Sequence, residues 1–360
     1  MSVLFSRDNS KGGPMFLRIA VIVCIVNCCA IADEAMFQVG NLPALPDTPG
    51  IATPFAGMID GDLIVAGGAN FPDAPPWKGG KKVWHDLIYR LNGQDWEVAG
   101  RLQRPLAYGV SIQTPKGLFC AGGSDSERHY ADVFWLTVKS DKIRQTAMPS
   151  LPLAVANACG AIVGDVLIVA GGTDRADATE AMNQVFALNL KGQPCRWESL
   201  PPIPGTGRML SVAAGTDEDF YLFSGASLER GMDGQPKRTY LKECFRFHLR
   251  SKQWTRLPDM PVATVAAPSP AAVIDSDRIV IFGGDDGSAV GFQPPEQHPG
   301  FRSKALILNF RTMTWSEADL PFSRVTVPLI HDGRRYIIPS GEMKPGIRSP
   351  AVFEVHFNGN

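Results

Sequence analysis

One sequence pattern recurs about every fifty residues, and it constrains the fold more than any other feature of the chain. An apolar run that ends in glycine, usually a glycine pair, occurs six times: LIVAGG at 63–68, LFCAGG at 118–123, LIVAGG at 167–172, YLFSG at 221–225, IVIFGG at 279–284 and YIIPSG at 336–341. Because repeats of this spacing are characteristic of solenoids and propellers, each copy is expected to form one supersecondary unit.

Each copy continues with further short apolar runs. A second run follows the glycines, as in DLIYRLN at 86–92 and KALILNF at 304–310. In four copies a third run contains a tryptophan: Trp96, Trp197, Trp254 and Trp315. A proline-containing link and a strand of small residues complete the copy. Four short strands per copy predict an all-β fold, a six-bladed kelch-type β-propeller. The glycines allow positive φ, and we expect the tryptophans to pack between blades.

The two ends of the repeat region are predicted to meet. The last copy has no fourth strand, because the chain stops after AVFEVHFNGN at 351–360. MFQVGNLPALP at 36–46 has the character of the missing strand. We expect this N-terminal strand to complete the sixth blade, which closes the ring and removes exposed sheet edges. The prediction is a single propeller domain within residues 33–360, with strands from about 36 to 357.

Residues 1–32 have the layout of a secretory signal peptide. Three basic residues precede the apolar stretch IAVIVCIVNCCAIA: Arg7, Lys11 and Arg18. Ala30-Ile31-Ala32 provides a cleavage motif. The stretch is shorter than the roughly 20 residues of a membrane helix. We therefore expect export to the periplasm or the medium, without stable membrane insertion after cleavage. A retained anchor and a true start at Met15 are the alternatives.

Composition excludes some classes of function and leaves other questions open. With 44% hydrophobic residues, 20% charged residues and a formal net charge of -1, the chain reads as a soluble globular protein without a basic run. Nucleic-acid binding is not expected, since it needs a concentrated basic surface. Cys120 and Cys159 lie in apolar runs and are predicted to be buried thiols. A disulfide between Cys195 and Cys244 is possible after export, and spacing alone cannot establish it. The oligomeric state stays open.

One end of the ring is predicted to carry the function. Strand direction alternates within a blade, so the loops between second and third strands emerge beside the links from one blade to the next. These segments place basic residues around Glu342: Lys81, Lys82, Arg104, Arg208, Arg324, Lys344 and Arg348. A positively lined funnel of this kind would concentrate small anions. Alternatively, the link arginines hold the blades together, and Glu342 with Arg348 forms a surface ion pair of small energetic value.

The C-terminal segment SGEMKPGIRSPAVFEVHFNG at 340–359 resembles the kelch-type N-acetylneuraminate epimerases, also called sialic acid mutarotases. In that family a GEAKPG-(L/I)-R segment precedes AVFE-(L/V)-x-F-x-G. The stretches FAGMIDGDLIVAGGANF at 55–71 and RPLAYGVSI at 104–112, and the two lysines before an aromatic residue at 81–84, are also similar. The similarity extends over the whole propeller region.

The chain also departs from this family in two respects. In the bacterial epimerases the blade with the GEAKPG motif lies mid-chain and the LIVAGGANF blade follows it. Here the order is cyclically permuted, which a closed ring tolerates because the same blades remain neighbours. The segment 226–243 has no counterpart that can be placed.

The resemblance implies an enzyme that interconverts the α and β anomers of free N-acetylneuraminic acid, an acidic sugar, without a cofactor or metal. Glu342 would act as general base, and Arg348 would pair with the C1 carboxylate through its planar fork. Further residues are candidates for substrate contacts: Asn70, Lys82, Arg104, Arg208 and Arg324. Asn70 could instead be a left-handed turn residue after Gly68.

Two other classes of function share this fold. A non-catalytic kelch module that binds a glycan or a protein is the first, and it has no need of a proton-transfer carboxylate beside an arginine. A kelch-type copper oxidase is the second, and it needs a cluster of histidine and tyrosine ligands. The histidines show no paired spacing: His85, His129, His248, His298, His331 and His356.

Overall fold

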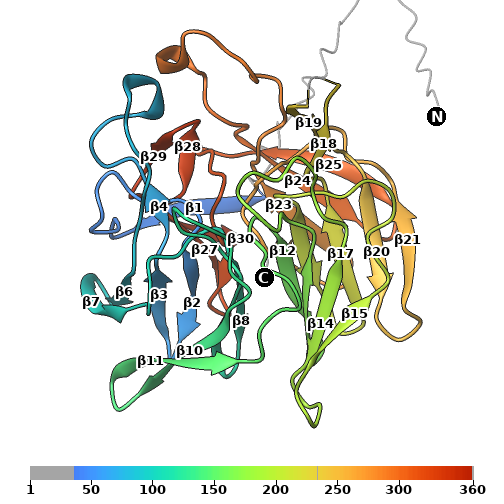
Figure 1. Cartoon of the computed structure of the whole chain (residues 1–360), viewed down its shortest axis with the longest axis horizontal. Coiled ribbons are helices and arrows are strands. Elements are labelled where there is room, and N and C mark those ends of the chain that lie inside the picture. Colours follow the sequence, from blue (N-terminus) through green and yellow to red (C-terminus); the bar gives the residue numbers. More distant parts are fainter. Residues whose placement is uncertain (1–35, 233, 359–360) are drawn as a thin grey trace, which may run out of the picture. The chain divides into compact units, whose positions relative to one another are not determined.

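The computed structural model describes residues 36–232 and 234–358, so the signal segment predicted at 1–32 lies outside it. Within these ranges the chain forms six four-stranded sheets and no α-helix. Each sheet is one sequence repeat, and the sheets stand around a common axis as blades (Figure 1). The prediction of an all-β, six-bladed propeller is confirmed.

The first three blades follow the chain in order. Blade 1 consists of β2 (Phe55–Ile59), β3 (Asp62–Ala66), β6 (Leu87–Asn92) and β7 (Asp95–Arg101). Blade 2 consists of β8 (Val110–Thr114), β9 (Gly117–Ala121), β10 (Val133–Lys139) and β11 (Lys142–Met148). Blade 3 consists of β12 (Cys159–Val163), β13 (Val166–Ala170), β14 (Val185–Asn189) and β15 (Trp197–Leu200).

The last three blades include the closure of the ring. Blade 4 consists of β16 (Val212–Gly215), β17 (Asp219–Phe223), β20 (Cys244–His248) and β21 (Gln253–Leu257). Blade 5 consists of β22 (Ala272–Val273), β23 (Arg278–Phe282), β24 (Lys304–Asn309) and β25 (Thr314–Asp319). Blade 6 consists of β26 (Ile330–His331), β27 (Tyr336–Pro339), β30 (Val352–Phe357) and the N-terminal β1 (Phe37–Leu42). β1 pairs antiparallel with β30, from Phe37 opposite Phe357 to Leu42 opposite Val352, as the sequence predicts.

The loops between second and third strands carry small elements of their own. These are β4 (Ala69–Asn70), the 3₁₀ helix η1 (Pro76–Lys78), β5 (Val83–Trp84), β18 (Ala226–Arg230), β19 (Pro236–Tyr240), the 3₁₀ helix η2 (Pro295–Gln297), β28 (Glu342–Lys344) and β29 (Ile347–Arg348). The β18–β19 and β28–β29 hairpins lie at the same end of the ring in Figure 1, at its top.

The glycine pairs end the second strands with an unusual backbone. Both residues of every pair have φ between 55° and 109°. At Gly67 an added Cβ would lie 2.3 Å from the carbonyl oxygen of Leu106, so only glycine fits there. Serine replaces the first glycine in blades 4 and 6, and its hydroxyl is used: Ser340 Oγ accepts the Ile51 N–H at 2.8 Å.

The tryptophans join neighbouring blades, as expected. Each indole N–H donates to a proline carbonyl of the preceding blade or its link, at 2.8–3.1 Å: Trp96 to Pro43, Trp197 to Pro149, Trp254 to Pro201 and Trp315 to Pro258. The indole ring covers apolar surface between the blades while its N–H is satisfied.

A closed ring of backbone hydrogen bonds surrounds the propeller axis, at the end where the loops between second and third strands emerge. Each blade contributes one residue with φ between 49° and 64°: Thr53, Tyr108, Asn157, Leu210, Ala266 and Thr326. Each N–H donates to the carbonyl of the equivalent residue in the preceding blade at 2.6–3.2 Å, and Thr53 closes the circle onto Thr326. We call these residues the floor ring, because the cavities described below stand on it.

The four described cysteines are free thiols, so Cys195 and Cys244 are not joined in this structure. Cys120 and Cys159 are buried, as predicted, and burial raises the pKa of Cys159 to about 12. In the portion of the chain that the structure covers, no helix has both the length and the apolar character of a membrane span.

Candidate functional site

The residue after each glycine pair stands next to the floor ring. The six equivalent residues are Ala69, Ser124, Thr173, Ala226, Asp285 and Glu342. Each forms a β-bridge with the residue that precedes its blade's floor-ring member, as Glu342 does with Val325. This position is small or hydroxylic in four blades and carries a carboxylate in the neighbouring blades 5 and 6.

Two adjoining cavities rise from the floor ring at this end. The larger, about 700 Å³, is lined by polar and aromatic groups including Lys82, Tyr108, Asn157 and Arg348, and we call it the polar compartment. The smaller, about 450 Å³, is lined mainly by apolar side chains of the 285–303 loop and η1, and we call it the apolar compartment. Both volumes suit a small organic ligand. The two share a border: Pro76, Leu210, Arg238, Thr326, Glu342 and Gly346.

Glu342 lies at this border with its carboxylate held in place. Its Oε1 accepts the Gly346 N–H at 2.6 Å and lies 3.2 Å from Arg348 Nη1. The β28–β29 pairing sets Glu342 directly opposite Arg348, so the Pro345–Gly346 turn brings the two together as the sequence suggests. The side chain of Glu342 is 15% exposed, which leaves the carboxylate reachable from the cavities.

Arg348 is much less accessible than Glu342. Its side chain is 4% exposed, and its guanidinium lies 4.7 Å from the centre of the Phe71 ring. Among the described residues, its Nε has no hydrogen-bond partner. Arg348 therefore supplies a fixed positive charge behind the carboxylate at the wall of the polar compartment, and its Nε is buried.

Lys82 also reaches the polar compartment. Its ammonium lies 5.0–5.8 Å from the ring centres of Tyr108, Trp84 and Phe71, distances suited to cation–π attraction. Its neighbour in the predicted basic set, Lys344, instead donates to the Glu296 carbonyl at 3.0 Å and ties the hairpin to the 285–303 loop.

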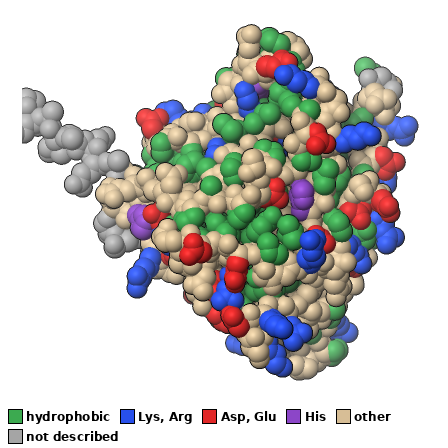
Figure 2. All heavy atoms as spheres, turned by 90° about the vertical axis from the view of Figure 1, so that its left-hand side faces the viewer, with side chains coloured by type: hydrophobic (Ala, Val, Ile, Leu, Met, Phe, Trp, Pro, Cys, Tyr) green, Lys and Arg blue, Asp and Glu red, His purple; other side chains and the backbone are tan. Residues whose placement is uncertain are grey.

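The lining is not uniformly positive, contrary to the expected basic funnel. Carboxylates stand among the cations in the two compartments: Asp125, Asp285 and Glu342. Figure 2 draws the side of the ring that lies at the left of Figure 1, and there too Lys and Arg side chains are interspersed with Asp, Glu and apolar side chains, without a continuous basic surface.

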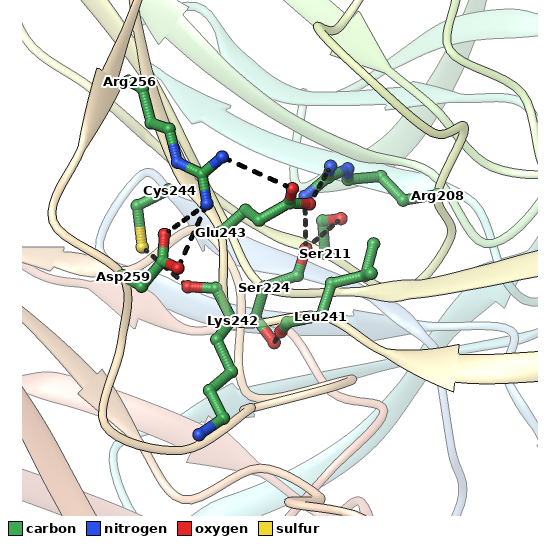
Figure 3. Close-up of polar contacts among 9 residues, drawn as sticks. All are labelled: Arg208, Ser211, Ser224, Leu241, Lys242, Glu243, Cys244, Arg256 and Asp259. Atoms are coloured by element: carbon green, nitrogen blue, oxygen red, sulfur yellow. Dashed lines mark hydrogen bonds and ion pairs between the residues drawn. The ribbon is translucent and has the colours of Figure 1, made fainter.

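The three link arginines are not brought to the cavities, which corrects their assignment as substrate contacts. Arg104 pairs with Asp132 at 2.5 Å and stacks on Tyr130. Arg208 is fully buried; it pairs with Glu243 at 2.8 Å and donates to the Ser224 carbonyl (Figure 3).

Arg324 is also held away from the cavities, although its partners include no carboxylate. It donates to Ser349 Oγ at 2.9 Å and lies over Phe353, and burial lowers its pKa to about 10. Each link arginine reaches the segment before the third strand of the next blade. The alternative expectation, that the link arginines hold the blades together, is therefore met by Arg104, Arg208 and Arg324.

Asn70 fits neither expectation. It is extended in β4, so it is not a left-handed turn residue. Its amide donates to Asp47 and to the Gly50 carbonyl, and its oxygen lies 2.9 Å from His85 Nε2. With its side chain buried and fully engaged, Asn70 braces the loop after the glycines and is not free to bind a sugar.

Other residues at the site escaped the sequence analysis. Asp285 follows Gly284 as Glu342 follows Gly341, and that shared repeat position could have revealed it. Tyr240 donates to Asp285 Oδ2 at 2.7 Å, and burial together with this contact raises the pKa of Tyr240 to about 12. Arg238 lines both compartments from β19, within the segment 226–243 that had no counterpart.

The polar compartment also contains a histidine. His129 Nε2 lies 3.2 Å from Thr173 Oγ1, and burial lowers the pKa of His129. Across the residues that the structure describes, no group of three or more His, Cys, Asp or Glu side chains is arranged to hold a metal ion.

Comparison with known proteins gives consistent matches. The sequence profile of N-acetylneuraminate epimerase matches residues 34–144 and 148–291. N-acetylneuraminate epimerase from Brucella suis is 40% identical over 102 residues, which are 25% of this chain and 26% of the relative. The enzyme of that name from Haemophilus influenzae is 24% identical over 234 residues, 58% of this chain and 59% of the relative.

A solved structure supports the fold. The structure of YjhT aligns with a TM-score of 0.63 at 14% identity, covering 89% of this chain and 98% of the other. The matches to the Brucella relatives span about a quarter of those proteins. Glu342 and Arg348 lie beyond the residues that the family profile matches, so their role depends on geometry.

Proposed function

Because the chain belongs to the N-acetylneuraminate epimerase family, we propose that it interconverts the α and β anomers of free N-acetylneuraminic acid. The observation that supports this most strongly is the position of Glu342, a carboxylate held by Arg348 and a backbone N–H at the border of two ligand-sized cavities. Anomer exchange needs one group that can take and return a proton next to a bound sugar.

The proposed steps conserve a single proton. Glu342 accepts the proton of the anomeric hydroxyl while the bond between the anomeric carbon and the ring oxygen breaks. The protonated Glu342 then gives its proton to the released ring oxygen, which leaves the open-chain keto acid. Rotation about the bond to the former anomeric carbon, and the reverse steps on the other face of the carbonyl, give the second anomer.

The sugar carboxylate is proposed to lie in the polar compartment. The positive charge of this compartment comes from four lining side chains: Lys82, Arg175, Arg238 and Arg348. Arg348 keeps the role suggested by the resemblance, a donor to the C1 carboxylate, and it simultaneously fixes Glu342. Holding the carboxylate beside Glu342 places the anomeric carbon within reach of the base, which is the positional part of the catalysis.

The proposal is tested by NMR of freshly dissolved α-N-acetylneuraminic acid. The protein is expected to bring the anomer signals to equilibrium much faster than buffer alone. The α-methyl glycoside, whose ring cannot open, serves as control and should remain unchanged. A rate equal to that in buffer would refute the proposed activity and favour a non-catalytic kelch binding module, which has the same fold.

We also propose that the chain acts after export, in the periplasm or the medium. The support is the signal-like pattern of residues 1–32. Fractionation of cells that produce the full chain tests this, because a protein found only in the cytoplasm with residues 1–32 intact would contradict it.

A further inference from the structure

The apolar compartment is not explained by proton transfer or by carboxylate binding. Glu342 belongs to its lining but Lys82 does not, and much of its wall is the 285–303 loop of blade 5. Two large apolar side chains of this loop are exposed, Val290 at 66% and Phe292 at 40%. Such exposure at the mouth of a cavity is typical of a surface that a ligand covers.

The wall of this compartment is built from aromatic side chains that contact one another. His298 lies 5.7 Å from the Phe292 ring centre and 6.1 Å from that of Phe301. Trp77 of η1 faces the same cavity from blade 1, where Gly346 packs against Pro76. These contacts hold the wall in place before a ligand arrives, which lowers the cost of ordering it on binding.

A strip of polar groups lies on the inner side of the apolar wall. Asp285 Oδ2 already accepts from the Tyr240 hydroxyl and Oδ1 from the Gly287 N–H, but a carboxylate has about four acceptor sites, so it can accept a further hydrogen bond. Arg238 offers donors only. An amide presents one N–H, which can donate to Asp285, and one C=O, which can accept from Arg238. Its alkyl part would then face the aromatic wall. A hydroxyl group has no alkyl part that could pack against this wall.

We infer that the apolar compartment binds the acylamino substituent of the sugar, with Phe292 as a specificity residue and Asp285 and Arg238 as partners of the amide. This inference rests on the proposed function for the identity of the sugar. A water molecule takes about 30 Å³ of liquid, so a compartment of about 450 Å³ exceeds the needs of a two-carbon acetyl group. Substituents longer than acetyl are therefore accepted as well.

The experiment compares three nonulosonic acids that differ only at C5: acetylamino, a longer acylamino such as propanoylamino, and hydroxyl. Anomer exchange is measured by NMR for the wild type, for Phe292→Ser and for Met313→Ser. Met313 is a matched control, since it is 39% exposed and lies in the β24–β25 turn of the same blade. Phe292→Ser is expected to raise KM about tenfold for both acylamino sugars, with no change for the hydroxyl sugar. Met313→Ser should match the wild type.

A binding readout separates this inference from the proposed function. In saturation-transfer NMR the acyl methyl protons should receive the strongest transfer from the wild type, and less from Phe292→Ser. If that pattern appears without faster anomer exchange, the proposed function fails and the acyl site stands. If Phe292→Ser affects the hydroxyl sugar as much as the acylamino sugars, or the acyl methyl receives little saturation, the acyl site is wrong.

Discussion

Two ion pairs in this protein each join a buried arginine to a glutamate, but one pair lies between blades and the other lies beside the cavities. Arg208 and Arg348 have side chains 0% and 4% exposed, and they lie 2.8 Å and 3.2 Å from Glu243 and Glu342 respectively. Glu243 lies between Arg208 and Arg256 in the seam where two blades meet (Figure 3). Glu342 instead lines both compartments. The place of each pair in the repeat, a link or a loop between second and third strands, decides its role.

The comparison predicts that substitutions in the Arg208–Glu243 pair reduce stability, whereas substitutions in the Glu342–Arg348 pair reduce activity. Breaking a buried pair by removing one partner leaves an uncompensated charge in the interior. Disturbing a proton-transfer carboxylate affects the reaction while the fold can persist.

The largest effect is expected for Arg208→Met. The substitution takes from Glu243 its partner at 2.8 Å and from the Ser224 carbonyl one of its two donors. Because Arg256 still lies 3.8 Å from Glu243 and the Glu243 side chain is 29% exposed, the free energy of unfolding should fall by about 3 kcal/mol, the lower end of the range for a broken buried pair. Urea unfolding followed by tryptophan fluorescence measures this loss. The kcat of the folded fraction should stay at the wild-type value, and a fall in kcat at unchanged stability would reverse the assignment of the pair.

Arg348→Lys should act on the reaction instead. Lysine keeps the charge but loses the planar fork that reaches Glu342 and an incoming carboxylate. We expect kcat/KM to fall about 100-fold, equivalent to ~2.7 kcal/mol, with a smaller loss of stability than in Arg208→Met. Anomer-exchange rates and urea unfolding of the same preparations provide both numbers. Wild-type kcat/KM in this variant would remove Arg348 from the site.

Gly346→Ala tests how the turn holds Glu342. Gly346 has φ of 77°, and an added Cβ would lie 2.6 Å from Pro76 Cδ, so the turn must shift and its N–H must move from Glu342. We expect kcat to fall about tenfold, since small displacements of a catalytic group are costly. Gly93→Ala is the matched control, because Gly93 has φ of 65° but open space around it. Equal effects of the two substitutions on kcat would show that backbone strain alone is responsible.

The smallest effect concerns pH at the cavity wall. Burial lowers the pKa of His129 below its ordinary value of 6.5. The unfolded chain therefore takes up a proton first as pH falls, so His129 makes the fold less stable below about pH 6.5. His129→Gln should reduce the loss of unfolding free energy between pH 7.5 and 5.5. If the variant loses as much stability as the wild type over this interval, His129 does not contribute.

Much of the fold could be predicted because its determinants are local and repeated. The glycine positions located the second strands, and the missing fourth strand of the last copy indicated that β1 would close blade 6. The Glu342–Arg348 pair could be found because it interrupts an otherwise plain turn, and Lys82 because the 69–85 loop emerges at the same end of the ring. Asp285 occupies the repeat position of Glu342, so this site residue was within reach of the sequence as well.

The remaining assignments depend on contacts that sequence spacing does not contain. Arg104 and Arg208 find their carboxylates, Asp132 and Glu243, 28 and 35 residues away in the next blade. Asn70 is occupied by Asp47, which the loop before β2 brings to it from 23 residues upstream. The β18–β19 hairpin becomes a wall of the cavities through contacts between blades, such as that of Tyr240 with Asp285 in blade 5.

The most direct test of the account replaces the glutamate of each pair by glutamine in turn. Glu342→Gln removes the group that takes the proton, so we predict that kcat for anomer exchange falls at least about 100-fold, with the protein still folded. Glu243→Gln should keep the wild-type kcat and lose stability to urea. The central claim is contradicted if Glu342→Gln exchanges anomers at the wild-type rate, or if Glu243→Gln loses as much kcat as Glu342→Gln.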